Sequence, residues 1–204
     1  FSKGEISTFY GFPTNRIFVI PNAVSGAFKP SPTDESTPYL LAVSSPSAHK
    51  NFNRMIQAFL TLRGHENLQL HIVGAASEIF ADPELQHLAC RDPRIRFLGR
   101  LTDAELIKQY QGATAFVFPS LYEGFGFPAG EAMACEIPLV STRGGALPEV
   151  VGEGGDTGVL VEPGSVRALA AGIRALLDAA PDARTRMGKA ARARVVENFT
   201  WRRT

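Results

Sequence analysis

The stretch TAFVFPSLYEGFGFPAGEAMACEIPLVST, residues 114–142, runs from one apolar segment through a glycine-rich turn and a helix start to a second apolar segment. The apolar runs at 114–118 and 138–142 are short and continuous, as expected of strands that are buried on both faces of a parallel sheet. Pro128 can occupy the first turn of a helix between them, where the missing backbone N–H has no partner to lose. The stretch therefore predicts a strand–helix–strand unit.

The same alternation extends over most of the chain. Apolar residues at helical spacing predict two further helices, one with Phe52, Met55, Ile56, Phe59 and Leu60, and one with Val166, Leu169, Ala170, Ile173, Leu176 and Leu177. Strand candidates alternate with the helical patterns, at 16–20, 39–43, 68–73, 95–99, 114–118, 138–142 and 158–161. Strands that alternate with helices indicate βαβ units, so the sequence predicts an α/β fold with a doubly wound, Rossmann-like parallel sheet.

The first 38 residues are set apart from this pattern. Residues 21–38 are rich in Pro, Ser, Thr and Asp and predict a loop, so everything before them, including the candidate strand at 16–20, is expected to be a hinge or lead-in. The sheet domain is predicted to span 39–204. The chain begins with Phe and has no charged-then-apolar signal layout, which indicates a piece of a longer chain.

Composition argues against several classes of protein. The 204 residues are 45% hydrophobic and 20% charged, as in an ordinary globular protein. The net charge of +1 argues against nucleic acid as the partner, and no apolar run is long enough for a membrane span. Cys90 and Cys135 lie far apart, which argues against a zinc site or a disulfide scaffold and is typical of a reducing compartment. No cluster of Asp, Glu and His has metal-ligand spacing, so we expect no metal.

The segment 181–199 predicts a basic helix, which carries Arg184, Arg186, Lys189, Arg192 and Arg194. Large apolar anchors are few along it, which favours a solvated helix face over a membrane-surface role. Peripheral association of the longer protein with a membrane is the alternative.

Two loops lie at the carboxyl ends of predicted strands, where open α/β sheets bind their ligands. The first, residues 44–51, follows the strand candidate at 39–43 and leads into a helix, whose N-terminus attracts phosphate through its free N–H groups. Lys50 adds a full positive charge there, and His49 lies beside it. This loop is a candidate phosphate site, and the alternative is a lysine in a solvated loop.

The second loop carries Glu123 and Glu131 with seven residues between them, among which Gly124 and Gly126 let the backbone approach a ligand closely. An acid near a helix N-terminus is stabilising by roughly 0.3–1 kcal/mol, which accounts for Glu131 but not for Glu123. Carboxylates accept hydrogen bonds from vicinal hydroxyls while amides hold phosphate or sugar oxygens, so the turn suits a nucleotide sugar. The glycine spacing, G-x-G-x-x-x-G, argues against a nicotinamide or flavin enzyme.

Residues 123–165, EGFGFPAGEAMACEIPLVSTRGGALPEVVGEGGDTGVLVEPGS, closely resemble the glutamate-x7-glutamate signature region of the large retaining glycosyltransferase family 4. Residues 95–126 resemble the segment that precedes it, RIFVIPNAV (16–24) the family's hinge, and HKNFNRMIQAF (49–59) its phosphate loop and helix. That family has the GT-B architecture, in which two Rossmann-like domains face each other across a cleft. The resemblance implies that this chain is the carboxyl-terminal, donor-binding half, preceded by the end of the amino-terminal domain in residues 1–38.

The resemblance also implies a role for each site residue. Glu131 would bind the ribose hydroxyls of the donor, Glu123 would lie near the transferred sugar and the reacting centre, and Lys50 would hold the diphosphate. The other donor-binding residues would be Gly124, Phe125 and Gly126 through their amides, Gly74 and Leu101 beside the nucleobase, and Ser44, Ser45 and His49 in the phosphate loop.

One position departs from the family pattern. Many relatives carry an arginine six residues before the lysine as a second clamp on the diphosphate, whereas this chain has Ser44. The loop resembles the Arg-Lys-Asn of a subgroup, with His49 in place of the arginine. The second clamp is then expected from His49, from Arg54 or from an arginine of the absent domain. Because GT-B enzymes generally dispense with a bound metal, the resemblance implies no metal and no other cofactor.

The function implied is that of a retaining glycosyltransferase in polysaccharide biosynthesis. It would transfer a hexose of mannose or glucose type from a nucleoside-diphosphate sugar to a saccharide or lipid-linked acceptor, and the loop favours GDP-mannose over UDP-glucose. The amino-terminal acceptor domain would be its partner, so this fragment alone is expected to be inactive. A cytoplasmic location is expected, at the inner membrane face if the acceptor is lipid-linked. The alternatives are a non-catalytic nucleotide-binding GT-B module in regulation or assembly, and another GT-B chemistry such as an epimerase or a phosphorylase.

Overall fold

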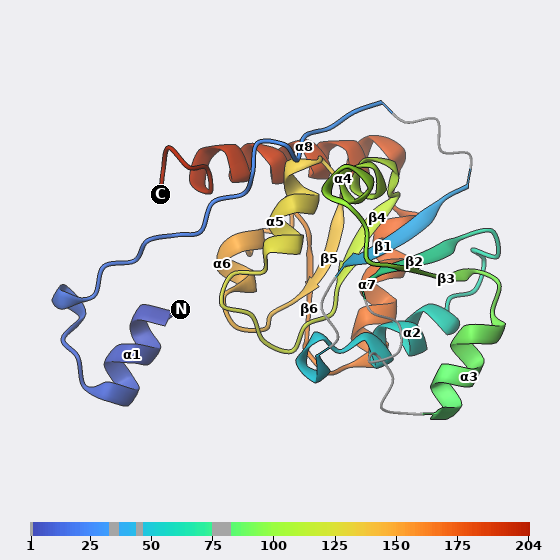
Figure 1. Ribbon diagram of the computed structural model, residues 1–204, viewed down its shortest axis with the longest axis horizontal. Helices are drawn as coiled ribbons and strands as arrows, with labels where there is room; N and C mark the ends of the chain where they lie inside the picture. Colours follow the sequence, from blue (N-terminus) through green and yellow to red (C-terminus); the bar gives the residue numbers. More distant parts are fainter. Residues whose placement is uncertain (1, 33–36, 44–46, 75–82) are drawn as a thin grey trace.

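A computed structural model of the chain describes residues 2–32, 37–43, 47–74 and 83–204 (Figure 1). Its centre is a sheet of six parallel strands in the order β3-β2-β1-β4-β5-β6. The strands are β1 (Tyr39–Val43), β2 (Gln69–Val73), β3 (Ile95–Gly99), β4 (Ala115–Phe118), β5 (Leu139–Thr142) and β6 (Val159–Val161). The strand order reverses between β1 and β4, as in a doubly wound Rossmann-like sheet, so the predicted fold class is confirmed.

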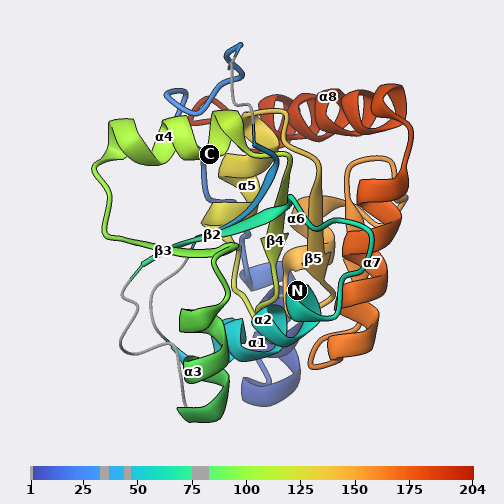
Figure 2. The same ribbon diagram turned by 90° about the vertical axis from the view of Figure 1, so that its right-hand side faces the viewer.

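Helices cover both faces of this sheet (Figure 2). One face carries α2 (Phe52–Leu60), α3 (Pro83–Arg91) and α7 (Val166–Asp178). The other carries α4 (Asp103–Gly112), α5 (Phe127–Ala134), α6 (Leu147–Val151) and α8 (Pro181–Asn198). Helix α1 (Ser2–Tyr10) and two short 3-10 turns, η1 (Thr14–Arg16) and η2 (Ala48–Lys50), complete the described elements.

Strand β1 shows why continuous apolar runs form strands in this chain. Leu40 and Ala42 belong to the core between the sheet and α2 and α7, whereas Tyr39 and Leu41 belong to the core under α4 and α5. All four side chains are fully buried. Burying a side chain of leucine size stabilises a fold by roughly 1.5–3 kcal/mol, and a strand places successive side chains on opposite faces. A continuous apolar run is therefore stable here as a strand that is covered on both sides.

The strand prediction for residues 16–20 is wrong. Arg16 ends η1, and from Ile17 onward the backbone runs without a strand partner in the part of the chain that the structure describes. The side chains of Phe18 and Ile20 are 85% and 71% exposed, and α1, which stands away from the sheet in Figure 1, buries none of its residues. A strand needs a neighbouring backbone as well as apolar residues, and no described strand pairs with this segment. The first buried residues of the lead-in are Ala23 and Val24, and Val24 packs into the core under α4 and α5.

The basic helix α8 is bound to the domain by three of its arginines. Arg184, Arg192 and Arg194 donate to main-chain carbonyls at the C-terminal ends of α7, α5 and α6, respectively. Carbonyls at helix ends have no partner within their own helices, and a cation there also interacts favourably with the helix dipole. The prediction of a solvated basic face is therefore wrong for these three residues. Within the described ranges, every helix is too short or too polar to cross a membrane.

Gly188 tests how closely α8 packs against the end of α5. Alanine is normally favoured over glycine in a helix by roughly 1 kcal/mol, but a Cβ at Gly188 would lie 2.0 Å from the carbonyl oxygen of Glu136. We expect Gly188→Ala to destabilise the fold by roughly 1–3 kcal/mol through overpacking, measured as a lower melting temperature. Gly4→Ala is the matched control, because Gly4 lies in α1 with nothing within 4 Å of the added Cβ. Equal melting temperatures for the two variants would contradict the close packing of α8.

Candidate functional site

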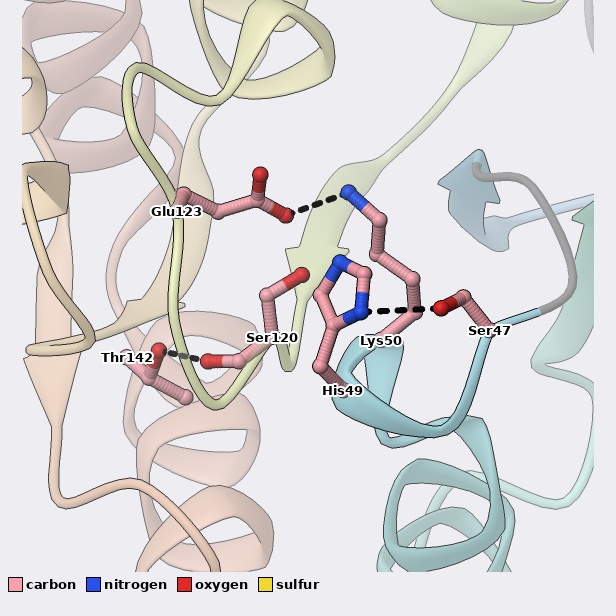
Figure 3. A network of polar contacts seen from close by, with 6 residues as sticks. All are labelled: Ser47, His49, Lys50, Ser120, Glu123 and Thr142. Atoms are coloured by element: carbon pink, nitrogen blue, oxygen red, sulfur yellow. Dashed lines mark hydrogen bonds and ion pairs between the residues drawn. The ribbon is translucent and has the colours of Figure 1, made fainter.

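The loops that follow β1 and β4 meet where the strand order reverses. In doubly wound sheets this point opens a crevice at the carboxyl ends of the strands. Figure 3 shows polar side chains from both loops turned toward one another, Ser47, His49 and Lys50 from the loop after β1 and Ser120 and Glu123 from the loop after β4. The structure thus brings together the two loops that the sequence singles out.

Lys50 and Glu123 form an ion pair across these loops, with 2.6 Å between Nζ and Oε1. Their side chains are only 15% and 11% exposed, and the Lys50 ammonium lies 5.8 Å from the centre of the Phe118 ring. A partly buried pair of charges is stable only while both partners remain, because removing one leaves the other desolvated and unpaired. An anion that binds Lys50 must therefore compete with the Glu123 carboxylate.

Hydrogen bonds fix the two loops against each other. Asn51 follows η2 with a left-handed φ of 60°, a conformation that asparagine tolerates better than most residues. Its side-chain amide donates to the carbonyl of Pro119 at 3.0 Å. The N–H of Leu121 donates to the carbonyl of His49 at 2.7 Å. These two bonds hold the loop after β1 directly on the loop after β4.

His49 and Arg54 are the two candidates within this chain for the missing second clamp. The His49 ring is exposed, and its Nδ1 lies 2.8 Å from the hydroxyl oxygen of Ser47. Its other ring nitrogen faces the space beside the ion pair (Figure 3). Arg54 donates from Nη1 to the side-chain oxygen of Asn51 at 2.9 Å, at the start of α2. The geometry therefore favours His49 over Arg54 as the residue beside Lys50.

The loop after β5 supports the segment that carries Glu123. The Thr142 hydroxyl donates to the carbonyl of Ser120 and accepts the N–H of Gly144 at 3.3 Å. Glu123 and Gly145 form an isolated parallel β-bridge. Gly145 has a φ of 66°, and a Cβ there would lie 2.3 Å from the carbonyl oxygen of Glu123. Only glycine permits this close approach, which fixes the main chain of Glu123 against the loop after β5.

The glycine-rich turn leads from Glu123 into α5. Gly126 precedes the helix with a φ of 89°, and a Cβ there would meet the Leu147 side chain at 2.6 Å. Phe125 is buried and packs edge-on against Phe199, with 5.4 Å between the ring centres, whereas its neighbour Gly124 is exposed. The Phe125 side chain thus anchors the turn in the core.

Glu131 lies in α5 and accepts a hydrogen bond of 2.8 Å from the hydroxyl of Tyr110 in α4. Burial raises the pKa of the Glu131 carboxyl, the bond from Tyr110 lowers it, and the charge of Asp103 raises it, with a net upward shift. The pKa of Tyr110 is raised well above its ordinary value by burial and by the charge of Glu131, so this hydroxyl stays protonated and donates. The described hydrogen bond of Glu131 is with Tyr110 and not with the ion pair, so the two glutamates occupy different parts of the site.

The other predicted site residues lie along the same edge of the sheet or outside the described part. Gly74 follows β2, and its N–H donates to the carbonyl of Gly99 at the end of β3 at 2.8 Å. Leu101 follows β3 and packs, half-buried, against the core under α4 and α5. Ser44 and Ser45 lie outside the described residues.

Metal-binding side chains do not gather in the described part of the chain, where no three or more His, Cys, Asp or Glu residues are grouped to hold an ion. The expectation that no metal is needed stays a prediction. Burial and the charge of Glu131 raise the pKa of the Cys135 thiol to about 12. That thiol, in the buried residue that follows α5, is therefore protonated at neutral pH and unreactive.

Sequence reasoning misses the residues on other elements that hold the site residues in place. Nothing local links Tyr110 to Glu131, because the two residues meet only when α4 packs beside α5. Thr142 ends a predicted strand and is followed by Arg143 and two glycines. That glycine pair is the one available signal, since adjacent glycines at a strand end often mark a close approach of two backbones.

Comparison with known proteins agrees with this picture. The model of the family described as Glycosyl transferases group 1 matches residues 26–194. The O-antigen chain mannosyltransferase B of Escherichia coli is 33% identical over 187 residues, which cover 85% of this chain and 48% of that protein. The MMP alpha-(1->4)-mannosyltransferase of Mycolicibacterium hassiacum is 31% identical over 207 residues, which cover 98% of this chain and 49% of that protein. The chain thus spans about half the length of the curated relatives that it matches.

Solved structures share the fold. The crystal structure of Anabaena Alr3699/HepE in complex with UDP and glucose superposes with a TM-score of 0.83 at 22% identity, covering 98% of this chain and 57% of that chain. The six-stranded parallel sheet with helices on both faces is that of one half of a GT-B glycosyltransferase.

Gly145→Ala tests the support that the loop after β5 gives to Glu123. Gly145 and Gly155 have φ values of 66° and 79°, but only Gly145 has backbone atoms close to its Cβ position. Alanine is expected to cost roughly 1–2 kcal/mol of backbone strain at either position. At Gly145 the clash with Glu123 is expected to add roughly 1–3 kcal/mol. Thermal unfolding of both variants measures the difference in stability. Equal losses of stability would show that the loop after β5 moves without cost to accommodate the added Cβ.

Glu131→Gln is expected to raise the melting temperature at neutral pH. The pKa of Glu131 is higher in the folded chain than in the unfolded chain, so stability is lost as pH rises from the ordinary carboxyl range through the folded pKa. A neutral glutamine avoids that loss and can still accept the bond from Tyr110. Thermal melts at about pH 3 and about pH 8, below and above the ordinary carboxyl range, measure the effect. The gain is expected at the higher pH alone, with Glu153→Gln on an exposed loop as the control; an equal gain at both would contradict the ionisation cost.

Proposed function

The chain belongs to the group 1 glycosyl transferases, and from that premise we propose that it is the donor-binding domain of a retaining glycosyltransferase. The longer protein transfers a hexose of mannose or glucose type from a nucleoside-diphosphate sugar to a saccharide or lipid-linked acceptor. The observation that carries the proposal is the Lys50–Glu123 ion pair at the carboxyl ends of β1 and β4. It holds one cation suited to a diphosphate in contact with one carboxylate suited to sugar hydroxyls.

In this proposal Lys50 binds the diphosphate of the donor. Its ammonium is a compact positive charge with three N–H donors, and at 15% exposure its attraction to phosphate is screened less than on an open surface. As the sugar leaves, negative charge grows on the diphosphate oxygen, and a cation already in place stabilises that charge. The exposed ring of His49 faces the same space and is the second side chain that donates a hydrogen bond to the diphosphate. It replaces the arginine that many relatives carry at the position of Ser44.

The two glutamates bind the two polyhydroxylated parts of the donor. Glu123 lies beside Lys50, so a sugar joined to the diphosphate brings its hydroxyls to this carboxylate. Glu131 lies farther along α5 and takes the ribose diol, with Gly74 and Leu101 bordering the nucleobase. Because hydroxyl donors favour the ionised form of a carboxylate, ribose binding offsets the burial that raises the pKa of Glu131.

The relatives support a hexose donor. The two curated relatives described above are mannosyltransferases by name, and the structural neighbour described above holds UDP and glucose. We place GDP-mannose first and UDP-glucose second. The acceptor binds a second domain, which the remaining half of the longer protein supplies. This chain alone is therefore expected to bind the donor without transferring the sugar.

Titration calorimetry of the chain with GDP, UDP, GDP-mannose and UDP-glucose tests the proposal. We expect one base to bind and the other to bind at least tenfold more weakly, a difference of about 1.4 kcal/mol. Absence of heat from all four ligands at millimolar concentration would contradict a donor site within this chain.

The role of Lys50 is tested in a Glu123→Gln background, so that the removal of Lys50 does not leave the Glu123 carboxylate buried without its partner. Glu123→Gln alone is expected to bind the free nucleoside diphosphate at least as tightly as the unchanged chain does, because Lys50 no longer has to leave a carboxylate. Adding Lys50→Met is expected to weaken that binding tenfold or more, about 1.4 kcal/mol. Lys189→Met, at an exposed position of α8, is the control. Equal affinities of the single and double variants would remove Lys50 from the diphosphate site.

A further inference from the structure

We propose that Ser120 is a positioning residue for the donor-bound state. Its hydroxyl donates a hydrogen bond to the Glu123 carboxylate when the diphosphate of the donor draws Lys50 away. This inference rests on the proposed function, because it requires an anionic ligand for Lys50. Ser120 lies in the loop after β4, three residues before Glu123.

Ser120 is fully buried, and its hydroxyl has no hydrogen-bond partner among the described residues. Leaving a hydroxyl buried and unpaired costs roughly 1–3 kcal/mol, and such groups are uncommon in folded proteins. An unpaired hydroxyl beside a charged site is therefore expected to find its partner in another state of that site.

Hydrogen bonds fix the main chain around this hydroxyl. Each residue from Pro119 to Leu121 has a main-chain group bonded either to the loop after β1 or to the end of β5. Figure 3 shows the Ser120 hydroxyl pointing toward the Lys50–Glu123 ion pair, with the His49 ring beside it. The hydrogen-bonded segment therefore places Ser120 beside the two charges, with its hydroxyl turned toward them.

Donor binding leaves the Glu123 carboxylate in need of a new hydrogen-bond donor. In this structure its partner is Lys50, at 2.6 Å. A diphosphate competes for the same ammonium, and when the ammonium turns toward it, a carboxylate that is 11% exposed loses its nearest counter-charge. A buried charge without donors is unfavourable. The Ser120 O–H can donate to this carboxylate in a charge-assisted hydrogen bond, which satisfies both groups at once.

The burial of Ser120 favours Glu123 over the donor as its partner. Lys50, Glu123 and His49 are each exposed to some degree, whereas Ser120 is not. A ligand that enters from solvent therefore meets those three side chains first. Ser120 then acts through Glu123, whose carboxylate it holds toward the sugar hydroxyls, and it is not itself a catalytic residue.

Ser120→Ala separates this role from a structural one. Because the hydroxyl has no partner in the donor-free chain, its removal is expected to leave the melting temperature unchanged or to raise it. The same substitution is expected to weaken the binding of UDP or GDP, whichever the unchanged chain binds, by about tenfold, the size of a hydrogen bond to a charged group. Ser141→Ala is the matched control, because Ser141 is equally buried in β5 and its hydroxyl is directed at a main-chain oxygen; it should not change nucleotide affinity.

A double-mutant cycle identifies the partner of the hydroxyl. In the Glu123→Gln background, Lys50 leaves no charged carboxylate behind, so Ser120→Ala is expected to change affinity by about twofold or less. A tenfold loss that persists in that background would show direct contact with the nucleotide and would overturn the inference. A larger drop in melting temperature than that of Ser141→Ala would overturn it as well. Nucleotide binding that is unaffected by Ser120→Ala overturns this inference alone, whereas no binding by the unchanged chain overturns the proposed function and the inference with it.

Discussion

The pairing of β1 with β4 is the constraint on which the site depends. These strands are far apart in the sequence but run parallel, with Leu40 opposite Ala115 and Leu41 opposite Phe116. Parallel neighbours end at the same edge of a sheet, so the loops after β1 and β4 begin side by side. A slip of one residue would move every side chain of β1 from one buried core to the other and disrupt the packing on both faces of the sheet. The packing of these strands therefore fixes the geometry of a charge pair that lies beyond their ends.

Much of the fold could be predicted from the sequence because a buried parallel strand has a local signature. A continuous apolar run such as the one at 39–43 indicates that both faces of the strand are buried, but it does not indicate which elements cover them. The failure at 16–20 has the same cause. Phe18 and Ile20 carry the same signal, but a pattern of side chains cannot show whether a neighbouring backbone offers hydrogen bonds, and here none does among the described elements.

Prediction of the site succeeds for residues whose chemistry is local and fails for residues that act over long distances in the chain. Lys50 and Glu123 follow predicted strands and carry charges that suit a nucleotide sugar, so each was found separately. Their contact depends on the strand order, which the sequence pattern alone leaves open. Tyr110 and Gly145 are further cases, because each supports a glutamate through packing between elements that sequence inspection cannot place side by side.

The distribution of unfavourable groups separates the binding edge of the domain from the rest. At the carboxyl ends of the strands, the chain tolerates a partly buried ion pair, a half-buried Glu131 with a raised pKa and an unpaired hydroxyl at Ser120. Along α8, by contrast, arginines satisfy the main-chain carbonyls of three helix ends. A ligand that supplies anionic and hydroxyl groups would relieve each of these unfavourable features of the binding edge. Such costs persist only where the surrounding structure is stable enough to hold them, and here that structure is the doubly covered sheet.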